Sequence, residues 1–337
     1  MREASFYTKL DHAVVRCGLC RFSCQIAPGH QGRCLVRENR DGTLYSLVYG
    51  LTIAEHVDPI EKKPLYHVLP GSTSYSVATV GCNFRCRHCQ NFAISQPVDG
   101  TLTIQGSERS PAELVTAALA AGCRSISYTY TEPTIYFEYA YDAAVLAHQA
   151  GLKNIFVTNG YICDVPLATI APYLDAANID LKAFSRGFYR DVVGADLEQV
   201  LASLREFRRL GIWIEITTLL IPGLNDDPAE LRAMAAFIAN ELGTDTPWHL
   251  SAFYPTFQLL DRPPTPAASL LSAREIGYGA GLKYVYLGNL RDATAGRTLC
   301  PGCSVRLIDR QGYSVSMTLA NNGSCHSCGA VVAGIWE

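Results

Sequence analysis

The chain has 337 residues, of which 48% are apolar and 18% charged, so it is long enough to bury a sizeable core and to form roughly two domains. Its 28 basic and 31 acidic residues leave a net charge of −3, which gives no basic footprint for nucleic acid or an anionic lipid surface. Residues 1–5 lack the apolar core of a signal peptide, and no apolar run approaches the roughly 18 residues of a membrane span. We therefore expect a cytoplasmic protein.

Thirteen cysteines are the unusual feature of the composition. In a long chain without an export signal, they indicate metal or cluster binding rather than disulfides. Cys123 and Cys163 stand alone, and we expect each to be a small, semi-buried apolar side chain. The others form three groups, which are Cys17, Cys20, Cys24 and Cys34; Cys82, Cys86 and Cys89; and Cys300, Cys303, Cys325 and Cys328.

The three cysteine groups suggest three domains. Residues 1–70 form an N-terminal segment with four cysteines, residues 71–296 a core of repeated βα units, and residues 297–337 a small C-terminal subdomain with four cysteines. The core contains short runs that are apolar on both faces, as is typical of buried parallel strands. These runs lie at residues 75–80, 125–131, 154–158, 177–182, 213–220, 249–253 and 283–287.

Helical patterns separate the predicted strands. Ser110, followed by Pro111 and an acidic first turn, indicates the start of one helix. Asp227 before Pro228 opens another helix in the same way, and this helix runs to about residue 242. Six or seven parallel βα units predict an α/β fold, which is a partial or full (β/α) barrel of parallel strands, with an open doubly wound sheet as the alternative.

The loop that follows the first predicted strand holds Cys82, Cys86 and Cys89 in C-x3-C-x2-C spacing. Three closely spaced thiolates suit an iron–sulfur cluster. A [4Fe–4S] cube needs four ligands, so three cysteines leave one iron open, much as a catalytic metal site keeps an open position. The loop leaves the C-terminal end of a strand, where βα barrels place their chemistry. A zinc knuckle or part of a structural metal site is the alternative.

This motif resembles the cluster-binding loop of the radical S-adenosylmethionine (SAM) enzymes. The resemblance implies that Cys82, Cys86 and Cys89 hold a catalytic, oxygen-sensitive [4Fe–4S] cluster and that SAM chelates its open iron. An electron, supplied by a donor such as ferredoxin or flavodoxin, would cleave SAM to methionine and a 5′-deoxyadenosyl radical. That radical would abstract hydrogen from a substrate that the sequence does not identify.

The resemblance also implies SAM contacts at the ends of later strands. Glu132 stands where family members bind the SAM amino group, and its alternative role is that of an acid at a helix N-terminus. Lys182 would neutralise the SAM carboxylate, unless it is merely solvated. Asn225 lies in the region that contacts adenine and ribose, and it is also a good turn residue. The full predicted set is His88, Glu132, Asn159, Asp180, Lys182 and Asn225.

Nearly the whole chain is similar to one subgroup of the pyruvate formate-lyase-activating-enzyme-like branch, the radical SAM proteins of the AmmeMemoRadiSam system. Arg21 and Ala252 depart from the subgroup pattern, which has Pro and Arg there. The resemblance implies AMMECR- and Memo-type partner proteins, and it leaves open whether the substrate is a small molecule or a protein. The similar segments are residues 17–20, 29–37, 61–67, 128–134, 248–251 and 284–289.

The other two cysteine groups have four members each. Cys300 to Cys328 follow the pattern C-x2-C, a 21-residue spacer with two candidate hairpin strands, and C-x2-C. This spacing predicts a zinc ribbon, with an auxiliary cluster as the rival. Cys17 to Cys34 have C-x2-C-x3-C-x9-C spacing, which suits zinc and an auxiliary [4Fe–4S] cluster equally.

Three functions are therefore in competition. The first is a radical SAM enzyme that acts on a small molecule or on a protein side chain. A glycyl-radical-type protein activase is an alternative within the same chemistry. The third, from another class, is a non-catalytic zinc scaffold or nucleic-acid-binding protein, which predicts a colourless protein with integral zinc and no SAM cleavage.

Overall fold

The computed structural model describes residues 1–290, 292 and 294–337, and its chain divides into two compact units. The domain boundaries expected from the sequence stay predictions. Among the described residues, no helix combines the length and the apolar character needed to cross a membrane. The first unit comprises Met1–Asp58, Thr73–Ala177 and Glu198–Ile212, and the second comprises Pro59–Ser72, Asn178–Leu197 and Trp213–Glu337.

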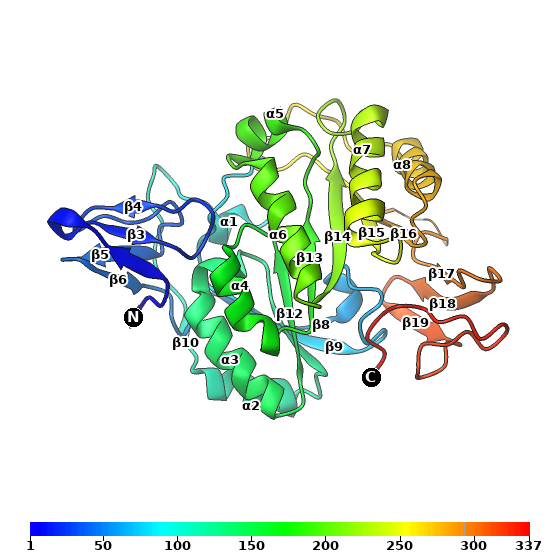
Figure 1. Cartoon of the computed structure of the whole chain (residues 1–337), viewed down its shortest axis with the longest axis horizontal. Coiled ribbons are helices and arrows are strands. Elements are labelled where there is room, and N and C mark those ends of the chain that lie inside the picture. The colour runs from blue at the N-terminus through cyan, green and yellow to red at the C-terminus, as the bar shows by residue number, and fades with distance from the viewer. Residues whose placement is uncertain (291, 293) are drawn as a thin grey trace. The chain divides into compact units, whose positions relative to one another are not determined.

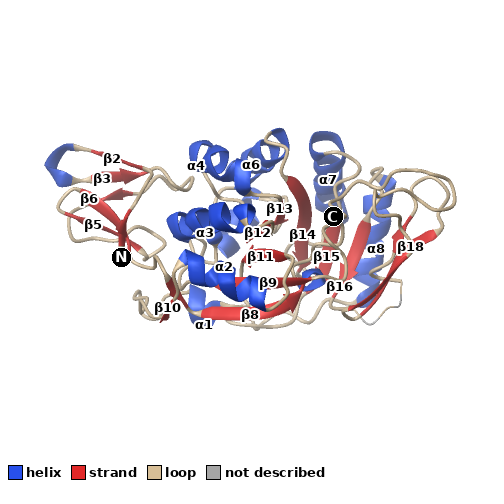
Figure 2. Cartoon of the chain, turned by 90° about the horizontal axis from the view of Figure 1, so that it is seen from below, coloured by secondary structure: helices blue, strands red, loops and turns tan. Residues whose placement is uncertain are grey.

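The N-terminal part of the first unit consists of short antiparallel strands (Figure 2). They form two small sheets, in the orders β1-β6-β5 and β2-β3-β4. Asp41 and Gly42 both have positive φ, 49° and 85°, which suits the tight turn that joins β5 to β6. Strands this short bury little apolar surface by themselves. Their bounds are β1 (Arg2–Glu3), β2 (Tyr7–Lys9), β3 (Val15–Cys17), β4 (Gln25–Ile26), β5 (Arg37–Arg40) and β6 (Thr43–Ser46).

The rest of the first unit is built from βα repeats (Figure 1). Strand β11 pairs in parallel with both β9 and β12, and all of its residues are buried. Helix α2 begins with a capping box, in which Ser110 and Glu113 satisfy each other's backbone N–H groups. It packs beside α3, and both helices contact β11. The main elements are β8 (Ala54–Pro59), β9 (Thr73–Ala78), α2 (Pro111–Ala120), β11 (Ser125–Tyr128), α3 (Phe137–Gln149) and β12 (Lys153–Thr158).

The second unit continues the alternation. Strand β15 pairs in parallel with β14 and β16, and helix α7 begins at Asp227, whose carboxylate accepts the N–H groups of Ala229 and Glu230. Gly277 of α8 allows close packing, because a Cβ there would lie 2.8 Å from Val285. The main elements are β13 (Ala176–Asp180), β14 (Trp213–Leu220), α7 (Pro228–Phe237), β15 (Trp248–Ala252), α8 (Ala267–Gly279) and β16 (Val285–Gly288).

Strands β8, β9 and β11–β16 belong to one eight-stranded, mostly parallel sheet, and helices alternate with the strands. The α/β fold class expected from the sequence is confirmed, and each expected strand overlaps an observed one. The remaining strands and α-helices are β7 (Leu51–Thr52), α1 (Phe92–Ser95), β10 (Ser107–Glu108), α4 (Asp164–Ile170), α5 (Arg186–Phe188) and α6 (Leu197–Arg209). The 3-10 turns are η1 (Asp11–Ala13), η2 (Ile60–Lys62), η3 (Pro133–Tyr136) and η4 (Ala171–Tyr173). The π-helical turns are η5 (Tyr189–Val193) and η6 (Ile238–Leu242).

The C-terminal part of the second unit is a small three-stranded antiparallel sheet in the order β17-β18-β19. The sequence predicts a hairpin between Cys303 and Cys325, and this hairpin is present as β18 and β19. Apolar residues of this sheet pack in one cluster with Tyr284 and Tyr286 of the preceding βα region. The strands are β17 (Thr298–Leu299), β18 (Arg306–Gln311) and β19 (Ser314–Met317).

Candidate active site and metal centres

The three-cysteine loop directly follows β9, as the sequence predicts, and α1 follows the loop. Gly81 begins the loop with a φ of +97°, a conformation that suits glycine. A Cβ on Gly81 would lie 2.7 Å from Cγ1 of Val36 and 3.1 Å from the carbonyl oxygen of Cys34. The N-terminal cysteine segment is therefore in direct contact with the start of the loop.

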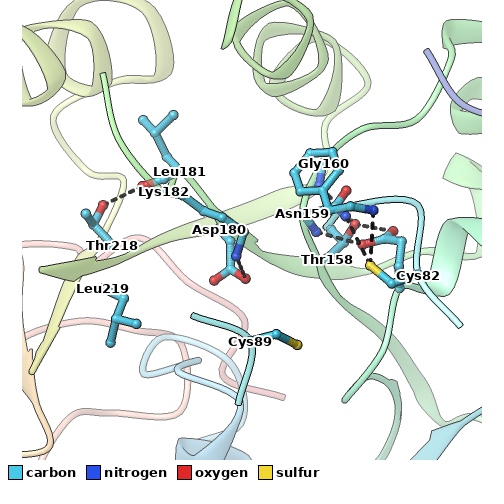
Figure 3. A network of polar contacts seen from close by, with 12 residues as sticks. Cys82, Cys89, Thr158, Asn159, Gly160, Asp180, Leu181, Lys182, Thr218 and Leu219 are labelled. Carbon is cyan, nitrogen blue, oxygen red and sulfur yellow. Dashed lines mark hydrogen bonds and ion pairs between the residues drawn. The ribbon is translucent and has the colours of Figure 1, made fainter. Parts of the chain in front are cut away.

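The surroundings of Cys82 suit a thiolate ligand. The backbone N–H of Phe84 donates to its Sγ at 3.4 Å, and Nδ2 of Asn159 lies 3.9 Å from the same atom (Figure 3). Burial raises the pKa of the Cys82 thiol well above its ordinary value, and the carboxylate of Glu132 raises it further. A bound cation would offset the cost of ionising this thiol, because metal binding and thiol deprotonation are coupled.

The other members of the loop differ in burial, because Cys89 is half-buried and Arg87 is exposed. Cys86 and His88 are buried, and Sγ of Cys89 lies 3.2 Å from Oγ of Ser95 in α1. Three buried or half-buried thiols in one loop, with N–H donors directed at the sulfur of Cys82, fit the ligand shell of an iron–sulfur cluster. This placement agrees with the predicted role of Cys82, Cys86 and Cys89 as cluster ligands. That role and the SAM contact of His88 stay predictions.

Glu132 is fully buried at the N-terminus of η3, where its carboxylate joins two strand ends. Its Oε1 accepts hydrogen bonds from the N–H and the hydroxyl of Thr134 and from the hydroxyl of Thr158. Its Oε2 accepts one from the backbone N–H of Asn159 at 2.8 Å. Burial raises the pKa of Glu132, and these donors oppose the shift. Glu132 is thus a helix-capping acid, the alternative considered above, and its contact with SAM stays a prediction.

Asn159 connects Glu132 to the cluster loop. Its Nδ2 donates to Oδ1 of Asn83 at 2.7 Å, while its own Oδ1 accepts the backbone N–H of Tyr161. The structure therefore brings Cys82, Glu132 and Asn159 together within the first unit. Asn83 is a member of this network that the sequence reasoning missed, and its only signal was its position next to Cys82.

Tyr130 occupies a backbone conformation that is uncommon for a residue with a side chain. It has a φ of 61° in the turn after β11, where the resembling family has glycines. Its carbonyl oxygen accepts a bond from Nδ2 of Asn91, and its hydroxyl bonds to the carboxylate of Asp58. The hydrogen bonds of the Tyr130 hydroxyl and carbonyl oxygen therefore stabilise a turn that has no glycine here.

The remaining predicted SAM contacts lie in the second unit. Nζ of Lys182 forms an ion pair with Asp180 at 2.9 Å (Figure 3). The amide of Asn225 is buried and pins the loop after β14, because its Oδ1 accepts the N–H of Ile221 and its Nδ2 donates to the carbonyl oxygens of Leu219 and Lys182. Asn225 thus has the turn role noted above, and the SAM contacts of these three residues stay predictions.

The four C-terminal cysteines converge on one point. Their Sγ atoms all lie within 4.8 Å of one another, with Cys300 and Cys328 3.5 Å apart and Cys303 and Cys325 3.8 Å apart. A tetrahedral ion with metal–sulfur bonds of about 2.3 Å requires sulfurs about 3.8 Å apart. Although burial opposes it, backbone N–H groups hold the pKa of the Cys300 thiol at about 6. This group has the geometry of a metal site.

The four N-terminal cysteines also come together, around a cavity that all of them line. Of the two isolated cysteines, Cys123 is buried and Cys163 half-buried, as expected from the sequence.

Comparison with known families identifies the class of protein. The Radical SAM superfamily model matches residues 76–235, which include the three-cysteine loop and the strands that follow it. This stretch of the chain therefore matches a radical SAM domain, which implies an enzyme with a [4Fe–4S] cluster and SAM. It belongs to the same family as the uncharacterized protein MJ0808 of Methanocaldococcus jannaschii, to which it is 45% identical over 94% of both chains.

Two further similarities are more distant. The isethionate sulfite-lyase activating enzyme of Nitratidesulfovibrio vulgaris is 30% identical over 27% of this chain and 31% of that enzyme. The crystal structure of a radical SAM methyltransferase from Sphaerobacter thermophilus has a TM-score of 0.52 and 17% identity, and the alignment covers 66% of this chain and 68% of that one. The structural likeness agrees with the fold class.

Proposed function

We propose that this protein binds a [4Fe–4S] cluster through Cys82, Cys86 and Cys89, cleaves SAM reductively and abstracts a hydrogen atom from its substrate. The observation that carries the proposal is the three-thiol loop at the end of β9, with N–H groups donating to the sulfur of Cys82, inside a radical SAM domain. When bound, the cluster and SAM would supply an electron and a 5′-deoxyadenosyl radical. We place the protein in the AmmeMemoRadiSam subgroup on its motifs.

The protein's own residues would hold and shield this chemistry. Asn159 orients the loop through Asn83 and joins it to Glu132, so hydrogen bonds connect the strand ends to the loop that carries the cysteines. Burial of Cys86 and His88 keeps water away from that side of the loop. Exclusion of water protects a reactive radical from side reactions.

The test is SAM cleavage by the anaerobically reconstituted protein. With dithionite, or with reduced flavodoxin as the electron donor, the wild-type protein should release 5′-deoxyadenosine, measured by liquid chromatography. Cys86→Ala should reduce this release at least about a hundredfold, because it removes a cluster ligand. Cys123→Ala is the matched control, since Cys123 is equally buried and lies outside all three groups. Undiminished release by Cys86→Ala would disprove the site.

A second candidate is a glycyl-radical protein activase. The similarity to the isethionate sulfite-lyase activating enzyme favours it, although that similarity spans only part of each chain. Electron paramagnetic resonance (EPR) separates the two candidates, because an activase leaves a stable radical on a partner protein. Deuterium transfer from a labelled small molecule into 5′-deoxyadenosine supports the first candidate instead.

We also propose that Cys300, Cys303, Cys325 and Cys328 bind zinc. Their mutual sulfur distances match the tetrahedral thiolate shell of a structural zinc site, and a closed shell of four thiolates leaves no position for substrate. The ion would stabilise a three-stranded sheet whose strands are only two to six residues long.

A further inference from the structure

We propose that Cys17, Cys20, Cys24 and Cys34 bind a second [4Fe–4S] cluster rather than zinc. The sequence spacing suits both metals, but the geometry of the four thiols separates them. All residues of this site belong to the first unit, and its metal content can be measured without SAM chemistry.

The first observation is the space that the four thiols surround. One pocket is lined by all four cysteines, by apolar side chains and by Arg37 and Asn83. The four thiols therefore border one common pocket. A cube of four irons and four sulfides binds its four thiolates at separate corners, whereas a single ion draws its ligands together.

The second observation is the spacing of the sulfurs, for which the C-terminal group is an internal standard. Across the part of the chain that the structure describes, Cys300, Cys303, Cys325 and Cys328 are the set whose ligand atoms lie within 4.8 Å of one another. The N-terminal sulfurs do not meet this limit. Thiolates that bind a cube sit on four different irons, so they lie farther apart than thiolates on one zinc.

The third observation is a pair of buried donors at the cavity wall. Nδ2 of Asn83 and Nε of Arg37 have no hydrogen-bond partner among the described residues, and both side chains are almost completely buried. The other two nitrogens of the Arg37 guanidinium are paired with the carboxylate of Glu138. Buried N–H groups rarely remain unsatisfied. The sulfurs of a cluster are acceptors for such groups, and these bonds help to set its potential.

The proposed second site adjoins the loop of the first. Nε of Arg33 donates to the carbonyl oxygen of Asn83 at 3.1 Å, and Arg85 donates to the carbonyl oxygens of Cys82 and Arg33. The Cys34 carbonyl contacts Gly81, as described above. With four protein thiolates the second cluster has no open iron, which suits electron exchange or structural support rather than substrate binding.

The experiment compares metal contents of full-length variants after anaerobic reconstitution with ferrous iron, sulfide and zinc. The variant with Cys82, Cys86 and Cys89 all replaced by alanine lacks the site of the proposed function. It should keep roughly four irons and four sulfides per chain, with the Mössbauer spectrum of a [4Fe–4S] cluster. The double variant Cys20→Ala/Cys24→Ala should lose a similar amount of iron, keep its zinc and retain the cluster that SAM perturbs in EPR spectra.

Two results would overturn the proposal. One is a Cys82/Cys86/Cys89→Ala protein that holds no iron and two zinc ions per chain. The other is a Cys20→Ala/Cys24→Ala protein that loses zinc instead of iron. Cys123→Ala and circular dichroism verify that a loss of metal does not reflect unfolding. Failure of SAM cleavage with four irons retained at the N-terminal site would contradict the proposed function and leave this inference standing.

Discussion

At the scale of single residues, Glu132 shows how one buried carboxylate organises the site. Four donors from η3 and the end of β12 converge on it, so its charge is compensated by dipoles within its own unit. One of these donors belongs to Asn159, which also contacts the cluster loop. A change at Glu132 therefore affects both stability and the position of the loop.

Glu132→Gln should lower the free energy of unfolding by about 1–3 kcal/mol, because an amide N–H₂ would face groups that are themselves donors. Thr158→Val removes one donor and keeps the carboxylate, and its expected cost is about 0.5–1.5 kcal/mol. Urea denaturation of the metal-free protein measures both values. Equal stability of Glu132→Gln and the wild-type protein would contradict the capping role.

The same pair of variants tests the predicted SAM contact. If Glu132 pairs with the SAM ammonium, Glu132→Gln should weaken SAM binding to the reconstituted protein far more than Thr158→Val does. Only the first variant removes the negative charge. Isothermal titration under anaerobic conditions gives the two dissociation constants, and equal values would exclude the contact.

At the scale of elements, the C-terminal sheet should depend on its metal. Cys303→Ser removes one ligand, so we expect loss of zinc by elemental analysis and faster amide hydrogen exchange in β17, β18 and β19. Exchange in α2, which belongs to the other unit, serves as the internal reference. Unchanged zinc content in this variant would show that the four thiols do not form the site.

Elements with local signals were predictable from the sequence. Ser110 with Pro111 and Glu113 marks the start of α2, and Asp227 marks that of α7, because capping is a contact between neighbours in the chain. Cysteine spacing likewise located the three-cysteine loop and the C-terminal metal site.

Contacts between distant residues were not predictable in this way. Asn83 meets Asn159, 76 positions later in the chain, and Arg37 pairs with Glu138, 101 positions later. Each pair depends on how the chain folds back, which leaves no periodic trace in the sequence. For the same reason the choice between zinc and a cluster at Cys17 to Cys34 requires sulfur positions rather than spacing.

At the scale of the whole molecule, buried polar contacts fix residues 59–72 within the second unit. The carboxylate of Glu215 accepts the backbone N–H groups of Tyr66 and His67 and lies 2.6 Å from Nε2 of His249. The ring of His67 lies between the carbonyl oxygen of Ala333 and the hydroxyl of Tyr286, both at 2.7 Å. A neutral imidazole satisfies both neighbours, with one N–H donor and one acceptor nitrogen.

This histidine should make stability depend on pH. Burial lowers the pKa of His67 from 6.5 to about 4, so the unfolded chain binds a proton there more readily than the folded chain does. The free energy of unfolding is therefore not reduced by this histidine above pH 6.5. It decreases as the pH falls from 6.5 towards 4, by about 3 kcal/mol in total. The measurement is urea denaturation of the wild-type protein and His67→Phe at several pH values. A stability difference that stays constant from pH 7 to 4 would contradict the prediction.

The bare backbone at Gly81 has a consequence for anyone who redesigns this protein. Because Val36 and the Cys34 carbonyl occupy the place of a side chain there, residues 76–235 taken alone would carry an uncovered patch into water. If that stretch is grafted onto another scaffold, the segment with Cys34 and Val36 must therefore be transferred with it. If the first 58 residues are exchanged between relatives, the residues that contact Gly81 must likewise be kept.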